Sequence, residues 1–158
     1  MRILYLMRHG EAELDVPVGT RDFDRPLTEH GRELIVKQAE TLIANDIAFD
    51  GLIASAAARA WQTAEIIAEK LEMQANRCIS WPILYSAKIQ EVIAVNIPRS
   101  WSSTILIGHN PVLSQVAAKL CSEFNEDLDE GQIIGISFPS SQWLWPHAGT
   151  LIHNFKSK

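Results

Sequence analysis

Residues 1–10, MRILYLMRHG, decide how this chain folds and where its chemistry lies. The run Arg2–Met7 is short, mostly apolar and without a period of two, a pattern typical of a buried strand in a parallel sheet. Arg8, His9 and Gly10 follow it directly. Ligands of open α/β sheets bind outside the carboxyl ends of the strands, so the sequence predicts a binding site at this triplet.

Two further apolar runs deliver polar groups in the same way. Thr104–Ile107 leads into Gly108 and His109, and Phe49–Ala54 precedes a helix that carries Arg59. The carboxyl ends of parallel strands meet at one edge of a sheet. We therefore expect two imidazoles and two guanidinium groups around one small volume.

Strands and helices alternate up to about residue 121, which indicates a three-layer α/β sandwich with a mostly parallel central sheet and helices on both faces. Thr28 is suited to cap the first helix, and Asn110 is suited to cap the last one, with Pro111 at its first position. The remaining helices are expected at residues 57–73, 86–96 and 112–121, and a β-ribbon at residues 133–138 and 143–155.

Composition bounds the class of protein. The chain has 158 residues, 47% hydrophobic and 21% charged, which is typical of one globular domain over residues 1–158. A net charge of −5 argues against nucleic-acid binding, which requires a basic surface. The first apolar run is too short for a signal peptide or a membrane span, so we expect a cytoplasmic monomer without a membrane partner. Cys78 and Cys121 lie in no metal-ligand spacing, and we expect neither a metal nor a cofactor.

The triplet after the first strand suits phosphoryl chemistry. Arg8 disfavours protonation of the neighbouring His9, and a neutral imidazole nitrogen is a competent nucleophile toward phosphorus. Gly10 lets a bound oxygen approach the backbone closely. The planar guanidinium groups of Arg8 and Arg59 match the charge that spreads over the phosphoryl oxygens, and His109 can donate to one of them.

These motifs together resemble those of a known family. In order and spacing they match the histidine phosphatase (phosphoglycerate mutase-like) superfamily, and most of all its small SixA-type phosphohistidine phosphatases, over residues 1 to about 121. The matching pieces are Arg8-His9-Gly10, Arg25-Pro26-Leu27-Thr28 with Gly31, Ser55 with Arg59-Ala60 and Thr63-Ala64, and Gly108-His109.

The resemblance implies a role for each matching residue. It makes His9 the phosphorylated nucleophile, Arg8 and Arg59 the arginines that bind phosphate, and His109 the second histidine of the pocket. Gly10 belongs to the same phosphate-binding set. The resemblance also implies one antiparallel edge strand in the sheet and a reaction without metal.

One departure from the family pattern bears on the substrate. Many members place a glutamate shortly after the third strand as the acid for the leaving group, and residues 81–85 here read WPILY. Without a positioned acid an alkoxide leaves about 10² to 10⁴ times more slowly, whereas the P–N bond of a phosphoramidate is labile. Loop carboxylates could supply the proton, although each is expected to be a solvated charge: Glu11, Asp15, Asp22 and Asp24.

Three functions stay open on the sequence alone. The leading hypothesis is a phosphatase acting on protein phosphohistidine, such as a histidine-containing phosphotransfer domain, through a covalent intermediate on His9. The second is a small-metabolite phosphomonoesterase that uses a loop carboxylate as acid. The third is a phosphate-binding module without turnover. Ser55 either contacts the phosphate or caps the helix that carries Arg59, and the cap is our expectation.

Overall fold

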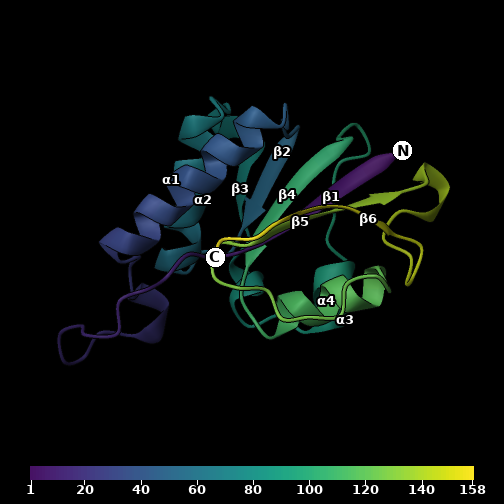
Figure 1. Cartoon of the computed structure of the whole chain (residues 1–158). Helices are drawn as coiled ribbons and strands as arrows, with labels where there is room; N and C mark the ends of the chain where they lie inside the picture. Colours follow the sequence, from purple (N-terminus) through teal and green to yellow (C-terminus); the bar gives the residue numbers. More distant parts are fainter.

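A six-stranded mixed sheet in the order β3-β2-β4-β1-β5-β6 runs through the middle of the molecule (Figure 1). The computed structural model describes residues 1–158. The strands are β1 (Arg2–Arg8), β2 (Gly51–Ala54), β3 (Cys78–Ser80), β4 (Ser103–Gly108), β5 (Ile133–Phe138) and β6 (Thr150–Phe155). The first four are parallel, while β5 is antiparallel to β1 and β6 is antiparallel to β5. The mostly parallel sheet is confirmed, and its antiparallel strand is β5, one place inside the edge that β6 forms.

Helices cover both faces of this sheet, as the alternation of elements predicts. The helices α1 (Glu29–Ala44) and α2 (Ala58–Lys70) lie on one face, and α3 (Ile89–Ile93) and α4 (Val112–Leu120) lie on the other (Figure 1). Four short 3-10 helices complete the elements: η1 (Asp22–Asp24), η2 (Ala75–Arg77), η3 (Pro82–Tyr85) and η4 (Ser140–Gln142). No helix is long and apolar enough to cross a membrane.

The central strand β1 is buried on both sides. Tyr5 and Met7 pack in the core beneath α1 and α2, whereas Leu4 and Leu6 pack in the core on the side of α4. Successive side chains of a strand point to opposite faces of the sheet, so a strand with a core on each side needs apolar residues at consecutive positions. This explains why the first run of the sequence shows no period of two.

Three local predictions need correction. Helix α3 is shorter than residues 86–96, and residues 143–149 turn instead of extending the last strand, with Leu144 and His147 at positive φ. Helix α4 begins after Pro111, so Asn110 is not its cap. Its side chain instead accepts hydrogen bonds from the backbone N–H and the hydroxyl of Ser114. Thr28 does cap α1, by accepting from the N–H of Gly31.

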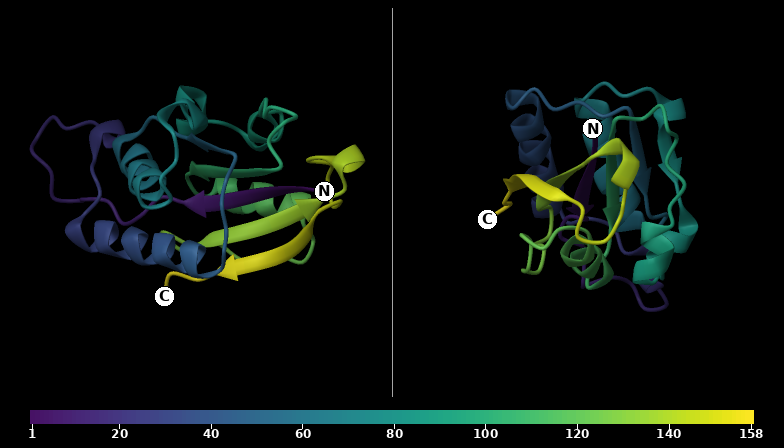
Figure 2. Two further views of the ribbon diagram at one scale, coloured as in Figure 1. Left: turned by 90° about the horizontal axis from the view of Figure 1, so that it is seen from above. Right: turned by 90° about the vertical axis from the view of Figure 1, so that its right-hand side faces the viewer.

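The carboxyl end of β1 opens into a long loop that returns to α1. Glu11 and Thr28 are joined by a backbone hydrogen bond, and a Cβ on Gly31 would lie 2.4 Å from the Glu11 carbonyl oxygen. The loop can therefore pack on the start of the helix only because residue 31 is glycine. Figure 2 shows this loop at the opposite end of the sheet from the N-terminus, at the edge where the site is expected.

Candidate active site

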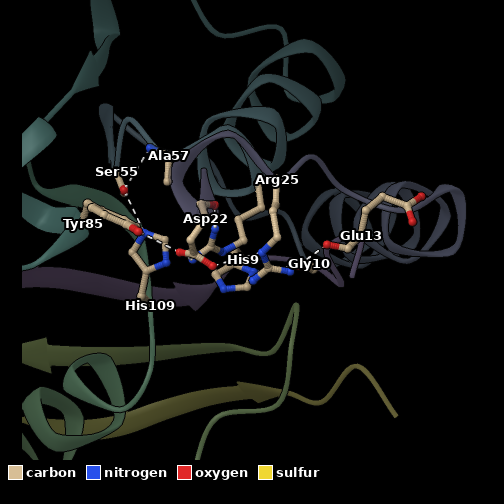
Figure 3. A network of polar contacts seen from close by, with 10 residues as sticks. His9, Gly10, Glu13, Asp22, Arg25, Ser55, Ala57, Tyr85 and His109 are labelled. Atoms are coloured by element: carbon tan, nitrogen blue, oxygen red, sulfur yellow. Dashed lines mark hydrogen bonds and ion pairs between the residues drawn. The ribbon is translucent and has the colours of Figure 1, made fainter. Parts of the chain in front are cut away.

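The two motif histidines lie side by side at the ends of β1 and β4. The register of these parallel strands pairs Arg8 with Gly108, so that His9 and His109 follow on neighbouring strands. Their ring centroids are 5.2 Å apart, and each residue is only 7% exposed (Figure 3). The predicted meeting of the two imidazoles is confirmed.

The ring of His9 is held in one tautomer by the next residue. Its Nδ1 lies 2.6 Å from the Gly10 carbonyl oxygen, which can only accept, so Nδ1 carries the proton (Figure 3). The pKa of His9 is lowered to about 3, mainly by burial, with His109, Arg59 and Arg8 acting in the same direction and the Gly10 hydrogen bond opposing them. The ring is therefore neutral near pH 7. Its Nε2, which makes no hydrogen bond within the protein, keeps a free lone pair.

The two arginines are anchored alike. Nη1 of Arg8 donates to the Leu128 carbonyl oxygen at 3.0 Å, and Nη1 of Arg59 donates to the Asp22 carbonyl oxygen at 2.8 Å. In both side chains Nε is buried and has no partner. Each guanidinium group is thus fixed at its far end, and its Nε edge is left for another acceptor.

His109 is oriented by Ser55, which follows β2. Nε2 of His109 lies 2.8 Å from Ser55 Oγ, and the same oxygen accepts from the Ala57 N–H at 3.2 Å (Figure 3). The predicted cap is wrong, because α2 begins after Ala57 without a side-chain cap and Ser55 accepts only from the N–H of Ala57 itself. The contact of Ser55 with the histidine was not predicted. Burial lowers the pKa of His109 to about 4, with Arg59 and Arg8 acting in the same direction and Asp22 against them.

Unpaired buried donors concentrate at this site. Four buried side-chain atoms of the chain have no hydrogen-bond partner, and three of them are Arg8 Nε, Arg59 Nε and His109 Nδ1. Buried polar groups are otherwise almost always paired. A group of unpaired donors, two of them cationic, beside a neutral imidazole is suited to bind an oxyanion.

Gly10 contributes in another way than predicted. Its N–H donates to Thr63 Oγ1 at 3.1 Å, and its carbonyl oxygen accepts from His9, so both backbone groups are engaged within the protein. A Cβ at this position would lie 3.1 Å from atoms of Leu27 and Ile35. The glycine therefore allows close packing and holds the His9 ring, and it offers no N–H to a ligand.

Asp22, which the sequence offered only as a possible acid, belongs to the site through its contact with Arg59. Its carboxylate accepts from Arg59 at 3.0 Å, from Arg25 at 3.0 Å and from the Tyr85 hydroxyl at 2.7 Å (Figure 3). The Tyr85 hydrogen bond, followed by those from Arg59 and Arg25, holds the pKa of Asp22 well below its usual range. Asp22 is an exposed, ionised loop charge as expected, but its hydrogen bonds connect it to Arg59, and an ionised carboxylate is unsuited to act as an acid.

Tyr85 lies in residues 81–85, the stretch without a carboxylate. The helix η3 brings its ring to 5.5 Å from the His109 ring, edge to face, and its hydroxyl to Asp22. None of the candidate loop carboxylates hydrogen-bonds a histidine: Glu11 accepts from Thr28 Oγ1, Asp24 pairs with Arg21, and Asp15 lines the cleft that contains His9. The segment thus supplies an aromatic wall and a hydroxyl in place of a carboxylate.

Two clefts meet at these residues. One of about 600 Å³ is lined by Arg8, His9 and Arg59 together with the loop after β1. Another, of about 410 Å³, is lined by Tyr85 and His109 with α3 and the start of α4. No group of three or more His, Cys, Asp and Glu side chains is arranged to hold a metal ion.

Comparison with known proteins agrees with this geometry. A family model of the histidine phosphatase superfamily (branch 1) matches residues 4–81, which include Arg8, His9 and Arg59. Among curated proteins, none matches the chain at a significant level. The fold of the whole chain is nevertheless shared with solved structures.

Three of these similar structures illustrate the range of similarity in fold and sequence. The protein histidine phosphatase SixA complexed with tungstate aligns with a TM-score of 0.81 and 23% identity, over 98% of this chain and 97% of that one. A protein of Agrobacterium tumefaciens assigned as a phosphohistidine phosphatase SixA gives 0.79 and 22%, over 97% of each chain. The alpha-ribazole phosphatase of Shigella flexneri gives 0.69 and 19%, over 98% and 96%. Residues 4–81 thus match the histidine phosphatase superfamily, and the whole chain has the fold of these phosphatase structures.

Proposed function

We propose that this protein is a metal-independent phosphatase that removes the phosphoryl group from a protein phosphohistidine by way of a covalent intermediate on His9. The observation that carries the proposal is the group of three buried side-chain nitrogens without a partner, two of them in guanidinium groups, beside the free nitrogen of a neutral imidazole. Donors fixed before the substrate arrives stabilise charge without reorganisation.

Each residue has a defined part in the first step. The Nε edges of Arg8 and Arg59 and the Nδ1–H of His109 hold the phosphoryl oxygens. Nε2 of His9 attacks phosphorus in line, the new P–Nε2 bond forms, and the P–N bond to the substrate imidazole breaks. The departing imidazole takes a proton from water. Water then attacks the phosphorus on His9, the P–Nε2 bond breaks, and its electron pair returns to Nε2. The proton that this water gives up replaces the one taken by the substrate imidazole, so that inorganic phosphate and a neutral His9 remain.

The lack of a carboxyl group at residues 81–85, together with the ionised state of Asp22, favours a phosphoramidate substrate. Asp22 is ionised, and residues 81–85 hold no carboxylate. An alkoxide would need a proton as it leaves, whereas an imidazole can leave and be protonated by solvent. The similar SixA structures are described as phosphohistidine phosphatases, and the tungstate of one of them is a tetrahedral oxyanion like phosphate.

The partner that we propose is a phosphorylated protein, such as a histidine-containing phosphotransfer domain. The site opens on two adjoining clefts of about 600 Å³ and 410 Å³. An exposed phosphohistidine on a protein surface can enter such an open site. A second candidate, a small-metabolite phosphomonoesterase, is favoured by the similarity to an alpha-ribazole phosphatase.

Turnover and covalent labelling test the proposal together. The purified protein is offered a ³²P-labelled phosphotransfer domain and, in parallel, sugar phosphates, nucleotides and alpha-ribazole phosphate. We expect release of phosphate from the phosphohistidine, label on His9 after a quench that avoids acid, and loss of about 10⁴-fold in kcat/KM for His9→Ala. The exposed His30 provides the control variant, His30→Ala, which should keep full activity.

Other outcomes assign the other functions. Activity on metabolite phosphates alone would replace the phosphohistidine substrate by an ester. Binding of the phosphorylated domain without turnover would make the protein a recognition module. Full activity in His9→Ala would overturn the nucleophile.

A further inference from the structure

We propose that Ser55 is a positioning residue that decides which nitrogen of His109 carries the proton, and thereby makes the neutral ring a donor to the phosphoryl group. The activity part of this inference rests on the proposed phosphatase function. The position of the proton, however, is a property of the free protein and can be measured without any substrate.

The hydrogen bonds of Ser55 can be accounted for completely. The residue is 0% exposed, and its hydroxyl contacts only the Ala57 N–H at 3.2 Å and His109 Nε2 at 2.8 Å. A backbone N–H can only donate, so it takes one lone pair of the hydroxyl oxygen. If His109 Nε2 also donated, the buried hydroxyl hydrogen would have no acceptor. The Ser55 O–H therefore donates, and Nε2 accepts.

This arrangement places the proton of a neutral His109 on Nδ1. That atom is buried and has no partner within the protein, so it is the one ring atom available to a phosphoryl oxygen. The opposite tautomer would turn a lone pair toward the anion and repel it. A neutral His109 can thus assist only with its proton on this side.

The charged groups around the ring make the tautomer decisive. Arg59 faces His109 from α2, Arg8 and His9 from the end of β1, Asp22 from η1 and Tyr85 from η3. Burial and the two arginines keep the pKa of His109 at about 4, with Asp22 opposing them. The ring is therefore uncharged near pH 7 and cannot rely on a second proton.

The tautomer of His9 is fixed in the same way, by one hydrogen bond, but with the roles of donor and acceptor reversed. A carbonyl oxygen, that of Gly10, accepts from His9 and leaves a lone pair free, whereas a hydroxyl donates to His109 and leaves an N–H free. One ring becomes a nucleophile and its neighbour a donor. Their distinct parts follow from the chemistry of a single adjacent group in each case.

Long-range ¹H–¹⁵N spectra of the free labelled protein at pH 7 test the tautomer. We expect the Nδ1–H form of His109 in the wild type, a shift toward the Nε2–H form in Ser55→Ala, and retention of Nδ1–H in Ser55→Thr, which keeps the hydroxyl. Thr104→Val is the matched control, because it removes a buried hydroxyl without a partner from the strand that leads to His109. An Nε2–H form in the wild type, or no shift in Ser55→Ala, would overturn the inference.

The pH profile of kcat/KM separates orientation from a merely structural effect. We expect Ser55→Ala to lose about tenfold to hundredfold at pH 7, by comparison with other residues that orient a reacting group. Part of this loss should be recovered as the pH falls toward 5, because a protonated ring carries N–H on both nitrogens. A loss that is equal at every pH, with the thermal unfolding temperature lowered, contradicts the inference.

Inorganic phosphate separates failure of the inference from failure of the proposed function. If the wild type turns over no substrate, phosphate affinity replaces kcat/KM, and the affinity should fall in Ser55→Ala and hold in Ser55→Thr. The tautomer measurement stands in either case. Equal phosphate affinity in Ser55→Ala and the wild type counts against the inference.

Discussion

The clefts at the two ends of the sheet differ in how their polar groups are satisfied. The larger, about 740 Å³, lies at the amino end of β2, between the segments that follow α1 and α2. There the Asp50 carboxylate accepts from the N–H groups of Ser102 and Ser103, and Arg77 donates to the Asp50 carbonyl oxygen. None of its lining residues holds a buried unpaired polar atom.

The smaller cleft at the carboxyl ends contains two of the unpaired donors, and the third adjoins it. If the active site were assigned by cleft volume alone, it would be assigned to the amino end of β2 and not to the histidines. Buried donors that the fold leaves unpaired are the better guide, because leaving them so is costly unless a ligand uses them.

Among the residues around the nucleophile, the largest effect is expected from Arg59. Arg59→Ala should lower kcat/KM by about 10² to 10³, the usual cost of removing a fixed donor to a developing anion. Arg59→Lys should also fail, since lysine keeps the charge without the planar edge. Arg77→Ala, in the larger cleft, should leave steady-state turnover unchanged. Similar losses in both clefts would remove the distinction between them.

Acid should destabilise the folded protein through the site histidines. Their pKa values are about 3 for His9 and about 4 for His109, against 6.5 for a free imidazole. Between these values the unfolded chain binds more protons, so the free energy of unfolding falls as the pH is lowered from 6.5.

Urea unfolding at pH 7 and pH 5 measures this effect. Replacing both rings by glutamine should reduce the pH-dependent loss of stability by about 2 kcal/mol or more. The exposed His30 and His147, replaced in the same way, should leave the pH dependence as it is. A pH dependence that survives removal of His9 and His109 would mean that neither ring is held neutral.

A moderate loss is expected from Asp22. Asp22→Ala releases the far end of the Arg59 guanidinium group, and kcat/KM should fall about tenfold, as for other residues that hold a reacting group in place. Asp24, which pairs only with the exposed Arg21, provides the control Asp24→Ala. Higher activity in Asp22→Ala would instead show that this carboxylate competes with the substrate for Arg59.

The smallest effect is expected from Tyr85→Phe. It removes the hydroxyl that donates to Asp22 and keeps the ring beside His109, so kcat/KM should fall only about threefold. Measuring kcat/KM of Tyr85→Phe and of Asp22→Ala in the same assay shows which variant loses more activity. A greater loss in Tyr85→Phe would place the hydroxyl on the substrate itself.

The sequence predicts the part of the site that the strands carry. His9 and His109 could be placed because apolar runs identify two buried strands and parallel strands end at one edge. Asp22 and Tyr85 could not, because Asp22 lies 37 residues from Arg59 and 63 from Tyr85, and only the folded loop brings them together. The contact of Ser55 with His109 has the same origin. Residues 143–149 turn through two residues of positive φ, and no glycine or asparagine stands at either to indicate it.

The attachment of the two histidines to the sheet also determines which part of the site loses its structure first on heating. Both follow the innermost strands, and the His9 N–H is bonded to the Gly108 carbonyl oxygen, so their spacing is fixed by the ladder of the sheet. The Asp22 side chain, in contrast, is 54% exposed on a loop. Amide exchange should therefore be slowest at His9 and fast around Asp22. On warming, the contact between Asp22 and Arg59 should be lost while the two imidazoles keep their positions. The contact should form again on cooling, because the protein has not unfolded.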